Sequence, residues 1–142
     1  MSKRRKSRSV TLPLAPPIRG LRPPDKQGPA TVSFRHAAIG GEYCLSACNA
    51  DQLRSVANTL RVMTTLSWQE IYRSARKGAG KSGLAWTPYH DRAIRRPRPD
   101  TIPAEVKLAG IRVSEKFRIL GYRLEDTFYV IWFDPSHKLV DG

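Results

Sequence analysis

The stretch that most constrains the fold lies late in the chain, at residues 116–133, KFRILGYRLEDTFYVIWF. Two runs of aromatic and branched residues flank the polar pair Glu125-Asp126, a pattern typical of two antiparallel strands and their turn. In the second run, residues 128–133 place apolar side chains on both faces of an alternating strand. Such a strand must be covered on both faces, or covered on one face and docked against a partner on the other.

The residues before and between these runs predict the remaining elements. Alternation at residues 32–35 and again at 43–48 predicts one or two short strands. Further strands are predicted at 106–113, 116–123 and 127–133, with a tight turn at Ser114-Glu115 and a short edge piece at 137–140.

Two helices are predicted between the first strand and the later ones. Asn49 or Asp51 can cap the first helix, and the pair Ser67 and Glu70 matches a capping box before the second. The apolar residues expected to face the sheet are Leu53, Val56, Ala57, Leu60 and Met63 in the first helix and Trp68, Ile71, Tyr72 and Ala75 in the second. The predicted fold class is therefore α+β, an antiparallel sheet with a two-helix hairpin packed on one face, in the order β-α-α-β-β-β.

The length of 142 residues suits one domain with an ordinary core. Residues 1–30 are basic and then proline-rich, without a period of 2 or 3.6, which predicts a flexible tail. Residues 31–142 are expected to form the single domain. Within it, residues 73–104 predict a basic loop rich in glycine and proline, and loops of that length in small domains are usually functional or disordered.

The net charge of +13 favours a polyanionic partner. The charge is concentrated in two segments, because residues 1–30 and residues 73–98 each contain eight lysines and arginines and one acid. The remaining residues carry nine bases and ten acids, so the body of the domain is close to neutral. For the tail, a nucleic-acid-binding arm and a solvated or localisation segment both remain open.

The two cysteines and the absence of long apolar runs indicate a reduced, cytoplasmic protein that does not cross a membrane. If Cys44 and Cys48 lie on one strand, about 13 Å separates them, which is too far for a disulfide. With His36 they do not give the four paired ligands of a structural zinc site. We therefore expect no metal and no cofactor.

Two short motifs in the basic segment are weak. Gly80-Lys81-Ser82 matches the end of a phosphate-binding loop, but Ala75 stands where that motif needs glycine. The sequence Tyr89-His90-Asp91 could supply a general acid or base, although a lone histidine beside an aspartate is more often a surface pair. Lys81 remains a candidate contact to a phosphate backbone.

Arginines in the predicted strands are the stronger candidates for a site. Arg118 is expected on the face of Leu120 and Tyr122, and Arg123 on the opposite face. Guanidiniums among apolar residues are costly to bury unless they meet an anion. In one interpretation, they pair with nearby carboxylates or reach the rim of the sheet. In the other, they hold a phosphodiester while a histidine or tyrosine moves a proton.

The order of elements and the run IRVSEKFRILGYR…FYVIWFDPSHK resemble the small RelE/ParE-type toxins of bacterial toxin–antitoxin systems. In that family a strand carries an aromatic-arginine-apolar triplet, matched here by residues 117–119, and a basic residue follows the last long strand, matched by His137-Lys138. The resemblance covers residues 43–140. The chain lacks the tyrosine-bearing C-terminal segment of the family and adds the basic tail and the 73–98 insertion.

The resemblance implies a small metal-independent ribonuclease that cleaves mRNA, on the ribosome in some members, and that binds an acidic antitoxin protein. The expected catalytic residues are Arg112, Arg118, Arg123, Tyr122 and His137, with Tyr129 as an alternative for stacking a base. The expected nucleic-acid-binding residues are Arg76, Lys77, Lys81, Arg92, Arg95, Arg96, Arg98, Lys116 and Lys138. The alternative is a non-catalytic module that binds nucleic acid or the ribosome through its tail and basic loop.

Overall fold

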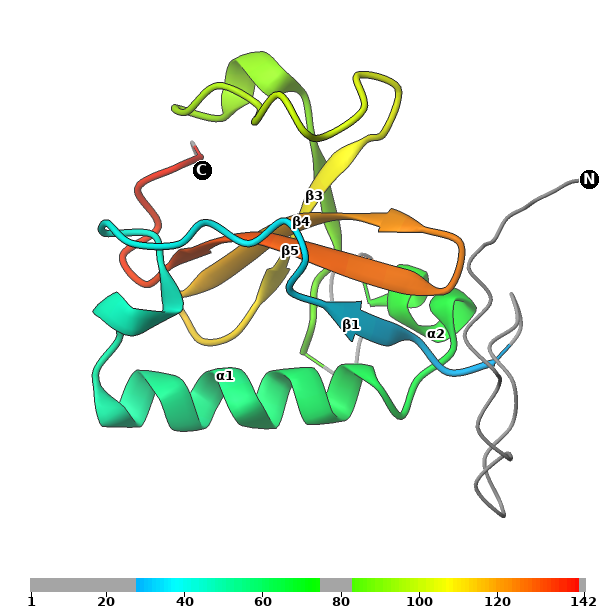
Figure 1. Ribbon diagram of the computed structural model, residues 1–142. Coiled ribbons are helices and arrows are strands. Elements are labelled where there is room, and N and C mark those ends of the chain that lie inside the picture. The colour runs from blue at the N-terminus through cyan, green and yellow to red at the C-terminus, as the bar shows by residue number, and fades with distance from the viewer. Residues whose placement is uncertain (1–27, 75–82, 141–142) are drawn as a thin grey trace, which may run out of the picture.

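The computed structural model describes residues 28–74 and 83–140 (Figure 1). Residues 1–27 of the tail predicted at 1–30 lie outside the described residues, as do Ala75 and three of the predicted nucleic-acid contacts, Arg76, Lys77 and Lys81. None of the helices in the described part of the chain is long and apolar enough to cross a membrane.

A mixed sheet of five strands and two α-helices make up the fold, in the order β1, α1, α2, β2, β3, β4 and β5. The strands are β1 (Thr31–Ser33), β2 (Thr87–Tyr89), β3 (Leu108–Arg112), β4 (Arg118–Leu124) and β5 (Thr127–Asp134). The helices are α1 (Ala50–Met63) and α2 (Trp68–Arg73), and there are two short 3₁₀ turns, η1 (Leu45–Ala47) and η2 (Asp91–Ala93).

The sheet order is β1-β5-β4-β3-β2, and this corrects the expectation of a purely antiparallel sheet. The strand β1 runs parallel to β5, with Thr31 opposite Thr127, whereas the other neighbouring strands are antiparallel. A parallel pair needs a long crossover connection, and the chain between β1 and β5 contains both helices and three strands. The α+β class itself is confirmed.

Side-chain caps begin both helices. Asn49 and Gln52 exchange the two hydrogen bonds of a capping box at the start of α1, and Ser67 and Glu70 do the same for α2. The buried face of α1 differs from the predicted one. Val56 and Met63 are buried, but Leu53 is 40 % exposed and Thr59 takes a buried position on the same stripe.

Tyr72 was also predicted to be on the buried side of α2, and it is 42 % exposed. Its ring still packs at 5.7 Å, between centroids, from both Trp68 and Trp86. Tyrosine commonly lies at the edge of an apolar core, because its ring packs against apolar side chains while its hydroxyl stays in contact with solvent.

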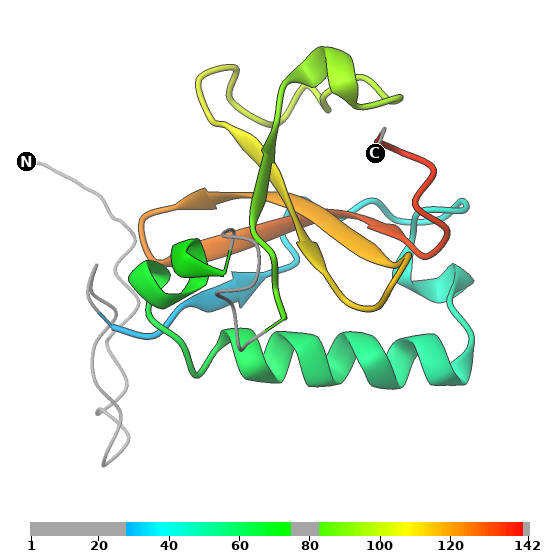
Figure 2. The same cartoon turned by 180° about the vertical axis from the view of Figure 1, so that it is seen from behind.

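Two apolar clusters enclose β5, one on each face of the sheet. The cluster on the helix side includes Met63, Ile71 and Phe128, and the cluster on the opposite side includes Leu120 and Ile131. Figures 1 and 2 show α1 below the sheet and the segment that contains η2 above it. The chain therefore covers both faces of β5 with its own residues.

A β-bulge breaks the predicted alternation of β5. Leu120 lies opposite Trp132, but Gly121 lies opposite Val130, so Ile131 is the extra residue on β5. Ile131 and Trp132 consequently both contribute to the cluster opposite the helices. The sequence prediction placed these two side chains on opposite faces, and this was wrong because alternation assumes an unbroken ladder.

The predicted strand at 43–48 is also wrong. These residues form the 3₁₀ turn η1 with extended residues on either side, closed by bonds from Ala47 N–H to Cys44 O (3.0 Å) and from Cys48 N–H to Leu45 O (3.1 Å). The edge piece predicted at 137–140 is a single bridge between Val140 and Ile94. Short alternating runs do not distinguish a strand from a compact turn.

Replacing Gly121 by alanine is expected to destabilise the protein by about 3 kcal/mol, since the added methyl group would overlap the backbone at Tyr129. A backbone carbonyl in a paired strand cannot move aside as a side chain can. The free energy of unfolding, measured in urea, checks this prediction.

Gly110→Ala is the matched control in the neighbouring strand. Its Cβ would lie 3.0 Å from a ring carbon of Tyr89, which is a side-chain atom that can shift. A loss in Gly121→Ala that is no larger than the loss in Gly110→Ala would contradict the proposed role of the close approach at Gly121.

Candidate functional site

Two arginines lie side by side where β3 ends and β4 begins. Arg112 is the direct cross-strand partner of Arg118, and Lys116 lies in the turn between them. Arg112 and Lys116 are exposed, and Arg118 is half-buried. The hairpin therefore presents three cations close together at its turn. Glu115 is the one acidic residue between Arg112 and Arg118 in the sequence.

The guanidinium of Arg118 is held by the turn. Its Nη1 donates hydrogen bonds to the carbonyl oxygens of Ser114 (2.8 Å), Glu115 (3.1 Å) and Phe117 (3.2 Å). Within the described residues, its Nε and Nη2 have no hydrogen-bond acceptor, and the Arg112 guanidinium has none either. The free donors of Arg118 are directed by a fixed side chain, and the free donors of both arginines are available for an anion.

The carboxylate on the residue directly across the sheet from Arg118 already has hydrogen-bond donors of its own. Asp134 is the cross-strand partner of Arg118 on β5, is fully buried, and accepts hydrogen bonds from the backbone N–H groups of Lys138 (2.9 Å) and Leu139 (2.8 Å). Burial and the neighbouring Arg112 lower the pKa of Arg118, while Tyr89 and Asp134 oppose that shift. Two adjacent guanidiniums therefore lack an ion-paired carboxylate in the described part of the chain.

Tyr89, which the sequence suggested only as part of the weak Tyr89-His90-Asp91 motif, lies close enough to Arg118 to feel its charge. It belongs to the edge strand β2, lies opposite Leu108, and packs against Gly110. Burial raises the pKa of its hydroxyl, an effect that Arg118 counteracts. The segment was predicted to be a loop because β2 has only three residues, and one of them is Pro88.

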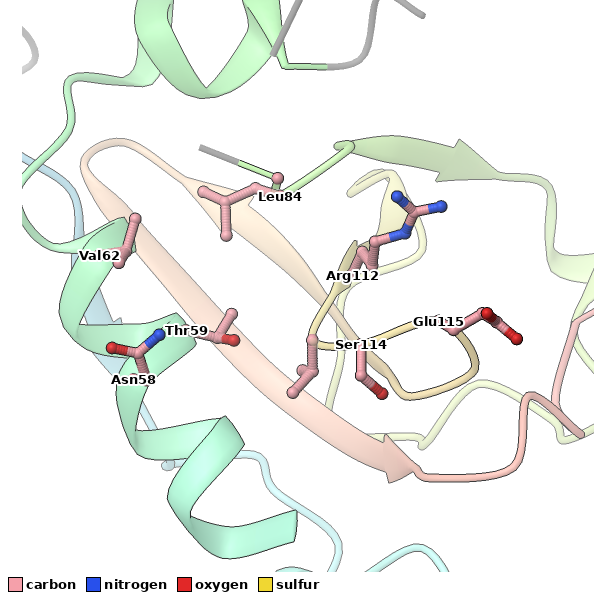
Figure 3. Close-up of a pocket in the computed structure, with 9 residues that line it drawn as sticks. Asn58, Thr59, Val62, Leu84, Arg112, Ser114 and Glu115 are labelled. Atoms are coloured by element: carbon pink, nitrogen blue, oxygen red, sulfur yellow. The ribbon is translucent and has the colours of Figure 1, made fainter. Parts of the chain in front are cut away.

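A cavity of about 500 Å³ lies beside Arg112, between α1 and the β3–β4 turn. Figure 3 shows Asn58, Thr59 and Val62 on one side and Arg112 on the other, with the Arg112 side chain extending away from the helix. The cavity is within the size range of small-molecule sites. Its lining consists of Asn58, Thr59, Val62, Gly83, Leu84, Arg112, Val113, Ser114 and Glu115.

Arg123 does not join this cluster. It lies five residues further along β4, on the helix side of the sheet, with its guanidinium carbon 4.6 Å from the Trp68 ring centroid. Its Nη1 donates to the Tyr72 hydroxyl (2.6 Å) and its Nε to the carbonyl of Glu125 (2.5 Å). These contacts tie the β4–β5 turn to α2, as expected for an arginine that reaches the rim of the sheet.

The two predicted proton-transferring residues differ in accessibility. Tyr122 is 2 % exposed and stacks on Tyr129, with the ring centroids 4.9 Å apart. Burial and Tyr129 raise the pKa of Tyr122. His137 is half-buried in the turn after Asp134, where its backbone has a left-handed φ of 59°.

The basic residues of the 92–98 segment have separate roles. Arg98 forms a bidentate ion pair with Asp91 (2.8 and 3.0 Å), and its side chain is only 14 % exposed. Arg95 donates to the carbonyl of Lys138 (3.2 Å), and the Arg96 guanidinium lies 4.7 Å from the centroid of the Tyr43 ring. This segment extends across the sheet face opposite the helices.

Arg92, Arg95, Arg96 and Lys138 are exposed. They come from the 92–98 segment and from the turn after β5, whereas Arg112 and Arg118 belong to the β3–β4 hairpin. Within the described residues, no three His, Cys, Asp or Glu side chains gather closely enough to hold a metal ion.

Comparison of the chain with profiles of known protein families, with curated proteins and with solved structures found no match.

Arg98 lowers the pKa of Asp91 through their hydrogen bonds and its charge. The contribution of this pair to stability is therefore fully present above the pKa of an unfolded aspartate, about 3.9, and is lost as the pH falls through the lower folded pKa. Arg98→Gln is expected to raise the pKa of Asp91, as measured by NMR titration of its carboxyl carbon.

Arg92→Gln is the control for this titration, because Arg92 is exposed and does not contribute to the shift at Asp91. An equal rise in the two variants would contradict the assignment of the shift to the Arg98 ion pair.

Proposed function

We propose that the protein binds RNA at Arg112 and Arg118 and cleaves it as a small metal-independent ribonuclease. The observation that supports this proposal is the pair of adjacent guanidiniums without a carboxylate partner among the described residues. Two like charges held side by side repel each other, and a phosphodiester relieves that repulsion while accepting their free N–H donors. The positive net charge favours the same class of partner.

Arginines so placed can do more than bind. In cleavage through the ribose 2′-hydroxyl, the attacked phosphate gains negative charge in the transition state, before it becomes a cyclic phosphate and releases the 5′-oxygen. Donors fixed by the fold stabilise that charge without rearranging during the reaction. The three carbonyl contacts of Arg118 supply such fixation.

We assign proton transfer to His137, with Tyr89 as a neighbour that orients the substrate. His137 follows Asp134, the cross-strand partner of Arg118, and histidine is the side chain most often used as general acid or base in enzymes that work near neutral pH. Tyr89 adjoins Arg118 and keeps its hydroxyl protonated at that pH. Tyr122 and Arg123 have no role in this proposal, since one is buried and the other is engaged by α2.

Arg112→Ala is expected to lower RNA cleavage and to weaken RNA binding about tenfold, because one charge-assisted hydrogen bond to phosphate contributes about 1.5 kcal/mol. Arg112 is the sharper choice of variant, because its guanidinium has no hydrogen-bond partner in the described structure, whereas Arg118 also supports the turn. Gel assays of mRNA cleavage, with and without ribosomes, and fluorescence anisotropy with single-stranded RNA measure the two effects.

Arg54→Ala is the matched control, since Arg54 is an exposed arginine on α1 that pairs with Asp51. Cleavage that persists unchanged in Arg112→Ala and Arg118→Ala, in preparations free of contaminating nuclease, would exclude this site. Binding without cleavage would exclude the enzymatic part of the proposal and leave the binding part.

A second candidate function is non-catalytic binding of nucleic acid through the 92–98 segment. The observation that favours it is the exposed group formed by Arg95, Arg96 and Lys138, in which two segments distant in sequence meet. Such a surface would follow a phosphate backbone without acting on it.

In that case, the double variant Arg92→Gln/Arg96→Gln is expected to reduce the slope of log affinity against log salt by about 1 to 2, because each phosphate contact adds roughly 0.7 to 0.9. Measuring RNA affinity over a series of salt concentrations checks this. An unchanged slope in this variant, together with a reduced slope in Arg112→Ala, would locate the interface at the β3–β4 turn instead.

A further inference from the structure

Cys44 and Cys48 are the only cysteines of the chain, and the structure places them at the two ends of the η1 turn. Both are free thiols. Cys44 is buried at 6 % exposure and Cys48 is partly exposed. The expected strand would have kept them about 13 Å apart, and the turn removes that constraint.

Backbone hydrogen bonds fold the chain back on itself between the two residues. The N–H of Ala47 bonds to the carbonyl of Cys44, and the N–H of Cys48 bonds to the carbonyl of Leu45. A four-residue turn of this kind has ends within about 7 Å, and Cys48 is one residue further. Burial is the main cause of the raised pKa of Cys48, and the two thiols are near enough for the charge of Cys44 to contribute to it. The disulfide range for Cα atoms extends to about 6.8 Å, so the bond requires η1 to tighten.

Cys44 has the environment of a reactive thiol. Its sulfur accepts hydrogen bonds from the Oγ (3.1 Å) and the backbone N–H (3.5 Å) of Ser46. These bonds favour the thiolate and lower the pKa of Cys44, whereas burial raises the pKa of Cys48. Ser46, which donates both bonds, is exposed, so only this turn residue separates the buried sulfur from solvent on that side.

We propose that Cys44 and Cys48 form a redox modification site, in which hydrogen peroxide converts the two thiols to an intramolecular disulfide. The Cys44 thiolate attacks one peroxide oxygen, which becomes the sulfenic acid while the other oxygen leaves as hydroxide and takes a proton. The Cys48 thiolate then attacks the Cys44 sulfur and expels the second oxygen as water. Two thiols are oxidised, one peroxide is reduced, and two waters form.

The disulfide would alter both elements that flank the turn. Cys48 packs against the cluster on the helix side and directly precedes Asn49, the N-cap of α1. On the other side, Tyr43 uses its carbonyl to accept the N–H of Phe133 on β5 (2.9 Å). Tightening η1 pulls on both attachments, and the resulting strain makes the bond easier to reduce.

The test uses the full-length protein treated with hydrogen peroxide and analysed by intact mass under non-reducing conditions. We expect the loss of two hydrogens in a monomer, loss of both alkylatable thiols, a lower thermal unfolding temperature, and recovery of all three by dithiothreitol. Peptide mapping should locate the bond between residues 44 and 48.

Variants distinguish Cys44, the thiol that attacks peroxide, from Cys48, the thiol that then closes the disulfide. Cys48→Ser should accumulate a sulfenic acid on Cys44 that dimedone traps, whereas Cys44→Ser should react slowly and yield little adduct. Ser46→Ala should slow oxidation several-fold, because it removes the side-chain hydrogen bond to the Cys44 sulfur. Ser114→Ala, at an exposed serine in the β3–β4 turn, should leave the rate unchanged.

Three outcomes would overturn the proposal. These are two thiols that stay alkylatable after peroxide treatment, a disulfide that forms only between chains, and a sulfenic acid that accumulates on Cys48 instead. If Cys44→Ser does not fold, the dimedone adduct in Cys48→Ser and the rate in Ser46→Ala still decide the question.

Discussion

The fold depends on burying a strand that is apolar on both faces. The strand β5 lies between β1 and β4. Its side chains divide between a cluster that faces the helices and a cluster that faces the η2 segment. Neither layer alone would keep β5 from water. This requirement explains why a small domain has a long excursion between α2 and β3, since that excursion supplies the second cover.

Because both faces of β5 are covered by apolar side chains, the arginines of the sheet lie towards the ends of the strands. Arg112 and Arg118 lie at one end of the β3–β4 hairpin, where the sheet gives way to solvent, and Arg123 lies near the other end of β4 on the opposite face. The same sheet thus separates arginines that are close in sequence. It brings Tyr89, from a distant edge strand, to the neighbourhood of Arg118.

Local patterns predicted the elements better than their assembly. The capping box at Ser67 and the alternating side-chain directions along β4 depend on nearby residues, so the sequence alone predicted them. The parallel pairing of β1, the bulge opposite Gly121 and the strand β2 depend on partners far along the chain. The candidate site was predicted only in part for the same reason. Arg112 and Arg118 follow from strand register, whereas the separation of Arg123 follows from packing against Trp68.

The pairing of β1 with β5 has a consequence for how the molecule forms. The Thr31 and Thr127 hydroxyls meet at 2.7 Å although 96 positions separate them. Closing so long a loop costs entropy before any contact compensates for it, whereas the β4–β5 hairpin closes locally. The hairpin is therefore a natural nucleus, and β1 is expected to dock late in folding and to detach first in native fluctuations. Amide exchange should thus be fastest along that edge of the sheet.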